Sequence, residues 1–293
     1  MQSETIIQIL TISALAGLLA AVGLRLTAVQ VIQALHKSRF TWIVAANFVL
    51  VPGITVAVAR LFQLPRETAM GMILLGAAPF APVVPVFARL ARSDLALAAG
   101  FTSLFPVLSA FATPIICGLA LRWLPGEASV PFRPGMVLLV LVMTITLPLV
   151  LGVACHHYAP GFSRRLLRPM EILSEATGAL SLGYVTVTEF GEILQTGVWS
   201  LVAMGIVFEV CTWLGWWLGN GSAAARQVVA FGTGNRNIAL ALLIAIQSFP
   251  RTRVVSAVVA NGLLLILLGL LHVAWWRWES PERRAPRAPL GGP

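Results

Sequence analysis

Apolar runs long enough to cross a membrane recur along the whole chain and constrain its fold more than any other feature. A helix rises about 1.5 Å per residue, so about 20 apolar residues cross the roughly 30 Å of hydrocarbon in a bilayer. Hydrophobic residues make up 58% of the 293 residues and charged residues 11%, whereas a soluble chain has about 25% charged residues. With a mean hydropathy of +0.88, the chain is predicted to be an all-α polytopic membrane protein.

The ends of the apolar runs predict about nine transmembrane helices, four in the first half and five in the second. The first repeat is expected over residues 5–121 and the second over 135–276, within one transmembrane domain of residues 1–278. The Pro/Arg-rich tail over 279–293 is expected to be disordered and cytoplasmic. The predicted spans are 5–24, 40–62, 68–90, 95–121, 135–155, 169–190, 199–218, 227–249 and 254–276.

The cationic residues outside the spans are distributed unevenly between the two sides of this map. One side holds Arg25, Lys37, Arg39, Arg89, Arg92, Arg164, Arg165, Arg168, Arg226, Arg277, Arg283, Arg284 and Arg287, and the other holds Arg60, Arg66, Arg122, Arg133, Arg251 and Arg253. Since cytoplasmic loops carry the excess of Lys and Arg, the C-terminus is expected in the cytoplasm and the N-terminus outside. A bacterial inner membrane is the expected location, and a eukaryotic plasma or organelle membrane would also fit.

Two of the predicted spans are interrupted at mid-depth. The third contains three prolines in APFAPVVP, residues 78–85, and the eighth contains GTGN, residues 232–235. Each is the penultimate span of its half and the two run in opposite directions, so the halves are predicted to form an inverted repeat with one discontinuous helix each. Discontinuous helices at corresponding positions indicate a transporter's substrate site. The alternative is that these residues only kink the helices, as they often do in membranes.

The densest polar cluster inside any span is formed by Thr233, Asn235, Arg236 and Asn237. An Arg at the centre of a membrane helix costs roughly 2.5 to 3.5 kcal/mol even on the lenient insertion scale, so it should have a partner or face a cavity. The fork of donors on its guanidinium suits a carboxylate. Arg236 is therefore predicted to contact the anionic group of a substrate, or alternatively to pair permanently with Glu209 in the seventh span.

Four further polar residues inside spans are candidates for the site. Glu209 could be a titrating group that couples transport to protons, because burial raises and a nearby Arg lowers a carboxyl pKa. Asn47, ahead of Pro52, could bond a freed carbonyl or line the cavity. Thr102 and Ser103 could contact substrate, although hydroxyls in membrane helices more often bond their own helix or a neighbouring one.

Several other classes of protein are disfavoured. The formal charge of +9 lies in short connectors and the tail rather than in a basic, aromatic-rich domain, so no nucleic acid partner is expected. The chain has no GxSxG, HExxH or P-loop sequence, and Asp94 is its only aspartate, so we expect no enzyme. Its three cysteines show no metal-ligand spacing, and no cofactor is predicted.

In the order in which they occur, several segments resemble those of the bile acid:sodium symporter family. These are AANFVLVP at 45–52, LPRETAMGMILLGAAPFAP at 64–82, LARSDLALAAGFTSLFPVLSAFATP at 90–114 and FGTGNRNIALAL at 231–242. The second is similar to the family's LPxxxAxGxILxGxxPGG, and the fourth to its E-(T/V)-G-x-Q-N. The resemblance implies panel and core domains, two crossing discontinuous helices and alternating-access transport of organic anions.

The sequence departs from this family at the positions that bind sodium. The family's sodium-binding Glu falls at Gly232 and its Gln at Arg236. Its Ser-Asn pair falls at Val84 and Pro85, and its Ser-Thr step at Phe105 and Pro106. Plausible oxygen ligands remain only at Asn47, Thr102, Ser103, Thr233 and Asn237. Sodium coupling is therefore doubtful, and the hypothesis is that Arg236 replaces the bound cation.

The function expected from the sequence is secondary active transport of a small organic anion across a lipid bilayer, at the crossing of the third and eighth spans. Bile acids, keto acids, pantoate-like acids and sulfonates all fit as substrates. The alternatives are a proton-coupled carrier that uses Glu209, and a membrane sensor or scaffold that keeps the fold without transport.

Overall fold

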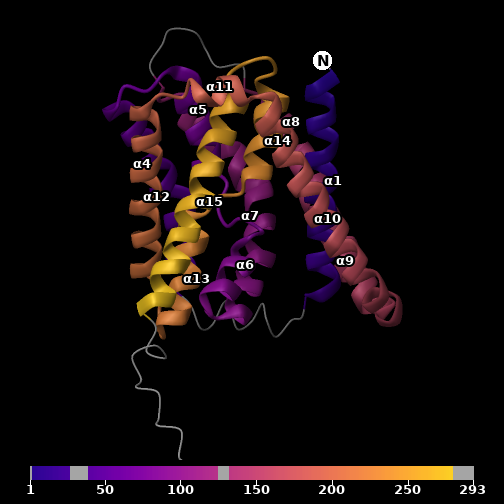
Figure 1. Ribbon diagram of the computed structural model, residues 1–293. Coiled ribbons are helices and arrows are strands. Elements are labelled where there is room, and N and C mark those ends of the chain that lie inside the picture. Colours follow the sequence, from indigo (N-terminus) through magenta and orange to yellow (C-terminus); the bar gives the residue numbers. More distant parts are fainter. Residues whose placement is uncertain (1, 27–38, 125–131, 280–293) are drawn as a thin grey trace, which may run out of the picture.

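The computed structural model describes residues 2–26, 39–124 and 132–279, and within them every regular element is helical (Figure 1). The tail expected over 279–293 therefore lies outside the described residues, apart from Glu279 at the end of the last helix. The elements are α1 (Gln2–Arg25), α3 (Phe40–Ala45), η1 (Ala46–Leu50), α4 (Val51–Leu61), α5 (Arg66–Gly76), α6 (Val84–Ala91), α7 (Leu95–Leu121), α8 (Pro134–Leu141), η2 (Val142–Thr146), α9 (Leu147–Tyr158), α10 (Pro160–Thr188), α11 (Phe190–Leu194), α12 (Val198–Leu218), α13 (Ala223–Gly234), α14 (Ile238–Ser248) and α15 (Val254–Glu279).

Seven helical segments of the described residues are long and apolar enough to cross a membrane. Two of them, over 40–61 and 134–158, each contain a short π-helical turn, η1 and η2, next to a proline at the start of the following helix. The two predicted spans that do not qualify are the third, which is divided into α5 and α6, and the sixth, in which α10 carries five charged residues. The structure thus confirms the all-α membrane class and does not confirm the count of nine.

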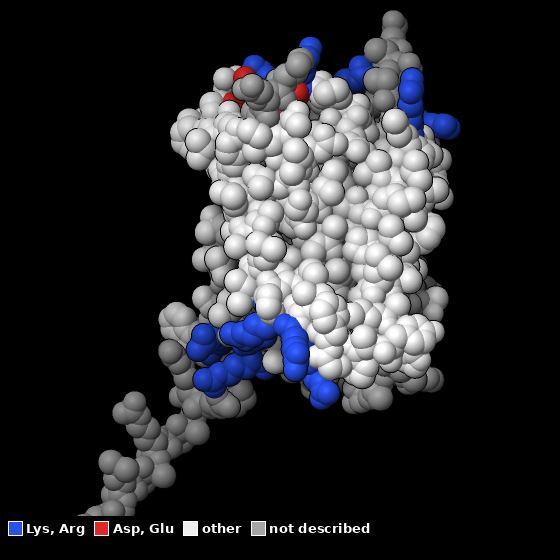
Figure 2. Space-filling view, turned by 90° about the vertical axis from the view of Figure 1, so that its right-hand side faces the viewer, with Lys and Arg blue, Asp and Glu red and all other residues white. Residues whose placement is uncertain are grey.

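The helices form two groups that lie side by side in Figure 1. In one group α1 packs along both α9 and α10, and in the other α12, α13 and α15 pack around α5 and α7. The principal contacts between the groups involve α14, the two ends of α15 and α7, and the short helices α8 and α11. Charged side chains lie at the two ends of the molecule, and Figure 2 shows no charge between them on the face in view. An uncharged belt of this kind suits the hydrocarbon of a bilayer.

Three polar contacts join the groups at the end that carries the N-terminus. The backbone N–H of Arg251 donates to Glu4 Oε1 at 2.9 Å. Arg253 Nε lies 2.7 Å from Glu192 Oε2, and Ser256 Oγ donates to Glu189 Oε2 at 2.6 Å. Because Glu4 belongs to α1 and the two other carboxylates lie at the start of α11, these contacts hold both to the connection between α14 and α15.

Glycines allow α1 and α9 to approach each other closely. A Cβ atom on Gly152 would overlap the carbonyl oxygen of Ala20, and it would lie 3.0 Å from Gly23 Cα. Small residues permit such close backbone packing, which stabilises helix pairs in membranes, where lipid tails remove the hydrophobic drive for association.

We expect Gly152→Ala to lower the melting temperature of the purified protein in detergent, because overpacking of this kind typically costs 1–3 kcal/mol, roughly. The matched control is Gly205→Ala in α12, where an added Cβ meets no atom within 4 Å. There the gain in helix propensity, about 0.5–1 kcal/mol, should leave stability unchanged or raised. Equal melting temperatures for the two variants would contradict the close packing of α1 on α9.

Candidate functional site

The two interrupted spans meet where each is broken. Residues 77–83 separate α5 from α6, and residues 235–237 separate α13 from α14. The freed backbone groups bond one another across the crossing: Phe80 N to Gly232 O at 3.2 Å, Ala81 N to Asn235 O at 3.2 Å, and Asn237 N to Ala78 O at 2.8 Å. Non-helical backbone at this depth is tolerated only where protein satisfies it, and these bonds do so.

The position of the second break differs slightly from the sequence-based prediction. Gly232 and Gly234 were expected to interrupt the helix, but both remain inside α13, and the break begins at Asn235. The glycines serve close packing instead, because a Cβ on Gly232 would overlap the ring of Phe80 and one on Gly234 would overlap the hydroxyl of Thr212. A side-chain cap starts the next helix: Asn237 Oδ1 accepts from Leu240 N at 3.0 Å.

Arg236 lies inside the break and is almost fully buried, with 4% of its surface exposed. Its Nη1 donates to Asn47 Oδ1 at 2.8 Å, and its Nη2 has no hydrogen-bond partner. The alternative in which Arg236 pairs permanently with Glu209 is wrong, because Glu209 Oε2 lies 3.4 Å from His272 Nε2 instead. A free guanidinium nitrogen in a buried site can donate to an anionic group.

Asn47 connects the break to the helix over 40–61. Its Nδ2 donates to Ile43 O at 2.9 Å and to Thr233 Oγ1 at 3.2 Å, while its Oδ1 accepts from Arg236. It lies in the π-helical turn η1, just ahead of Pro52, which has no N–H to donate. Asn47 therefore both bonds a carbonyl of its own helix and belongs to the polar cluster, so the two roles considered from the sequence coexist.

A small cavity of about 10 Å³ adjoins Arg236, room for roughly one water molecule. Its polar lining is Arg236, Cys211 and Asn261, and Asn261 Oδ1 also has no hydrogen-bond partner. The rest of the lining is Met72, Leu75, Gly76, Met204, Val207, Phe208, Gly234 and Leu265. The site is thus closed around Arg236, and an organic anion could enter only after the helices separate.

Glu209 and His272 form a separate polar pair between α12 and α15. The ring of His272 is buried and its Nδ1 lies 3.0 Å from Leu268 O, while 42% of the Glu209 side chain is exposed. The ring of Phe208, which lines the Arg236 cavity, lies 5.5 Å from that of His272. The pair is therefore one side chain away from the cavity.

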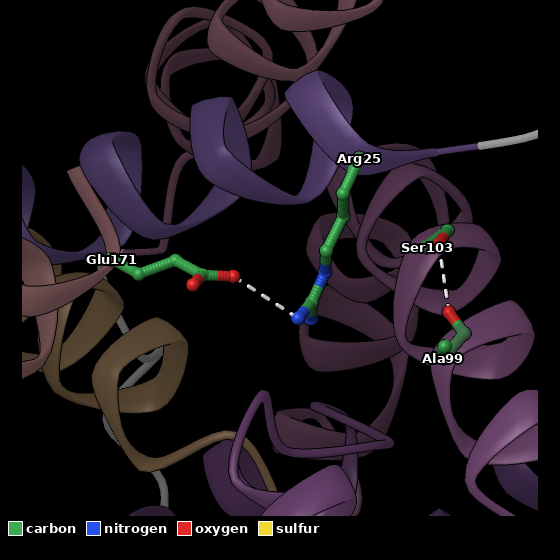
Figure 3. Close-up of polar contacts among 4 residues, drawn as sticks. All are labelled: Arg25, Ala99, Ser103 and Glu171. Carbon is green, nitrogen blue, oxygen red and sulfur yellow. Dashed lines mark hydrogen bonds and ion pairs between the residues drawn. The ribbon is translucent and has the colours of Figure 1, made fainter. Parts of the chain in front are cut away.

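The remaining candidates are not brought to Arg236 by any hydrogen bond. Thr102 Oγ1 donates to Ala98 O and Ser103 Oγ to Ala99 O, both at 2.7 Å, so each hydroxyl bonds its own helix. Figure 3 shows the second of these bonds beside an ion pair of 3.1 Å between Arg25 and Glu171. Asn235 Nδ2 is buried without a partner.

Aromatic rings occupy the side of the crossing that faces α7. Phe80 stacks on Phe105 with 4.0 Å between ring centroids and meets Phe101 edge-on at 5.2 Å. Its φ of 54° lies in the left-handed region, which is strained for a bulky side chain and is maintained by the surrounding packing. Val84 and Pro85 form the first turn of α6, and Pro106 lies inside α7 next to Phe105. None of these side chains offers an oxygen to a cation.

Two contributors to the site were missed from the sequence. Phe80 stands among prolines that drew attention for another reason, and Asn261 is a single amide in the apolar run VVANGLLLIL. The amide in that run was the signal that could have identified Asn261. No comparable signal marked Phe80, whose role depends on its contact with Gly232.

An all-helical protein with an uncharged belt and two interrupted helices that meet at a buried cation has the architecture of a membrane transporter. A family model gives the particular family: residues 12–196 match the Sodium Bile acid symporter family, and the chain belongs to that family. The structure and the match together agree with a transport protein rather than an enzyme.

Curated relatives agree with this assignment. The chain is 24% identical over 237 residues to the probable sodium/metabolite cotransporter BASS3 of Arabidopsis thaliana, which covers 79% of this chain and 54% of that protein. It is 22% identical over 239 residues to the probable sodium/metabolite cotransporter BASS2 of rice, covering 79% and 55%. It is 24% identical over 255 residues to the sodium-dependent transporter YocS of Bacillus subtilis, covering 83% and 74%. The chain thus spans about half the length of the two plant relatives.

We expect Asn47→Ala to destabilise the protein, because it removes the acceptor of Arg236 Nη1 in a buried site. Hydrogen bonds to charged groups contribute about 1.5–3 kcal/mol. The control is Thr177→Ala, which removes only a bond to Leu173 O within α10. Thermal unfolding in detergent should show a clear loss for Asn47→Ala alone, and similar curves for the two variants would mean that Arg236 does not depend on this contact.

Proposed function

We propose that the protein is a secondary active transporter of small organic anions, working by alternating access, with Arg236 contacting the anionic group of the substrate. The observation that carries the proposal is a buried guanidinium with one nitrogen free and no acidic partner. Small organic solutes are the substrates that the printed name sodium/metabolite cotransporter gives to the plant relatives. A single fixed cation among apolar walls suits an anion that carries an apolar portion.

We further propose the topology expected from the sequence. Nine spans would form an inverted repeat over 5–121 and 135–276, with panel and core domains and the tail of 279–293 on the cytoplasmic side. Support comes from the two groups of helices and from the arginines at the inner ends of α1, α6 and α15. The N-terminus would then lie outside, in a bacterial inner membrane.

Transport is proposed to be independent of sodium, in contrast to the coupling that the names of the relatives give. Support comes from position 232, where the family's carboxylate would have to occupy the space taken by the Phe80 ring. Further support comes from Phe105, which stacks on that ring where the resemblance places a hydroxyl. A sodium ion prefers several oxygen ligands, and in this proposal the charge of Arg236 takes its place.

The two alternatives remain distinct from this proposal. A proton-coupled carrier would use Glu209, and its contact with His272 near the cavity is the observation in its favour. A sensor or scaffold would bind a ligand without moving it across the membrane. Measured flux of a substrate in proteoliposomes separates the second from any carrier.

Binding of an organic anion should stabilise the wild-type protein and fail to stabilise Arg236→Ala. A ligand at 100 times its dissociation constant adds about 2.7 kcal/mol, which thermal unfolding resolves. A panel of keto acids, bile acids and sulfonates is tested, each in sodium and in potassium salts at equal ionic strength. The control is Arg89→Ala, an exposed arginine on α6, which should respond like the wild type. Stabilisation that persists in Arg236→Ala would refute the proposed contact.

The double variant Phe80→Gly with Gly232→Glu should acquire stabilisation by sodium over potassium, because it exchanges the ring for a carboxylate in the same space. Gly232→Glu alone should lower stability without a sodium effect, since its Cβ would overlap the ring. The same thermal measurement compares the two salts. Sodium-specific stabilisation of the wild type that is lost in Thr233→Ala or Asn237→Ala would overturn the proposed sodium independence.

A further inference from the structure

The charge of Arg236 is not balanced by any acidic side chain of the described residues. Its one hydrogen bond goes to the neutral amide of Asn47. The acids that could have served are engaged elsewhere: Asp94 caps α7, Glu171 pairs with Arg25, Glu189 accepts from Ser256, Glu192 pairs with Arg253 and Glu209 faces His272.

The helix ends at the crossing do not balance the charge either. The C-terminal ends of α5 and α13 meet there, each equivalent to about half a negative charge, and so do the N-terminal ends of α6 and α14, each equivalent to about half a positive charge. These four contributions cancel to a first approximation. The closed crossing therefore carries about one net positive charge away from water.

The space beside Nη2 suits a single-atom ligand. The cavity has room for roughly one water molecule, and Nη2 has no other partner. A water could satisfy Nη2 and Asn261 Oδ1, but it would leave the charge unbalanced. A halide ion would accept from Nη2 and neutralise it, and rotation of the Asn261 amide would turn its N–H₂ group toward the ion.

We propose that Arg236 binds a halide ion such as chloride when no organic anion is present, and that the carrier is consequently an obligate anion exchanger. This inference rests on the proposed function and adds its mode of operation. With an anion at Arg236 the closed site is neutral, whereas the empty site must pass through the closed state with a buried, unbalanced charge. The lenient scale for an Arg in hydrocarbon corresponds to a factor of about 100 in population, so return of the empty carrier should be slow.

Binding of the halide is tested by thermal unfolding in potassium iodide, potassium chloride and potassium sulfate at equal ionic strength. The halides should raise the melting temperature of the wild type and of the exposed control Arg89→Ala above its value in sulfate. The variants Arg236→Gln and Asn47→Asp should show no such difference. Asn47→Asp is close in volume to the original residue and places a carboxylate where the amide oxygen now lies 2.8 Å from Nη1, so the site is neutralised internally.

Exchange is tested in proteoliposomes of the full chain with labelled external chloride. Uptake should be at least tenfold faster into vesicles loaded with chloride than into vesicles loaded with sulfate, with valinomycin and potassium present to dissipate any voltage. Equal rates in both would overturn obligate exchange. So would halide stabilisation that survives in Arg236→Gln.

The outcomes also separate this inference from the function on which it rests. If organic anions stabilise the wild type through Arg236 and halides do not, the carrier stands and the halide site is refuted. If halides bind through Arg236 and no organic anion binds or is transported, the halide site stands and the proposed organic-anion carrier is refuted.

Discussion

Polar backbone groups freed in the middle of a membrane have no water to bond, and this constraint organises the centre of the molecule. Residues 77–83 and 235–237 leave the helical path, and their N–H and C=O groups bond one another across the crossing. The bonds hold the two breaks in register, and the position of Arg236 between α13 and α14 follows from that register. Asn47 reaches the same place from a third helix, so three segments distant in sequence are joined at one polar cluster.

The crossing exchanges one kind of interaction for another. On one side, the space next to Gly232 is filled by the ring of Phe80, which stacks on Phe105 and removes any room for an ion ligand. On the other side, the guanidinium of Arg236 supplies a permanent positive charge beside a cavity with apolar walls. A bound, dissociable cation and a covalently attached one differ in one respect that bears on transport, because the attached charge cannot leave when the substrate does. This is why the balance of charge at the closed site bears on the mode of transport.

The closed cavity and the contacts at the N-terminal end describe one conformation of such a cycle. Glu4, Glu189 and Glu192 hold α1 and α11 to the connection between α14 and α15 at that end. The cavity at Arg236 admits no more than a small ligand. Movement of the α1, α9 and α10 group relative to the other helices would have to break these contacts on one side while it opens the crossing to the other.

The sequence by itself determined the membrane class, the helix ends to within a few residues and the two interruptions, because hydropathy, proline and buried charge act locally along the chain. It also identified the family and the polar cluster of Thr233, Arg236 and Asn47. Only the tertiary structure decided which groups meet, since contacts between segments about 190 residues apart depend on packing that no local pattern encodes. Packing joined Arg236 to Asn47 and not to Glu209, kept Gly232 inside a helix, and brought Phe80 into the space that a side chain at position 232 would need.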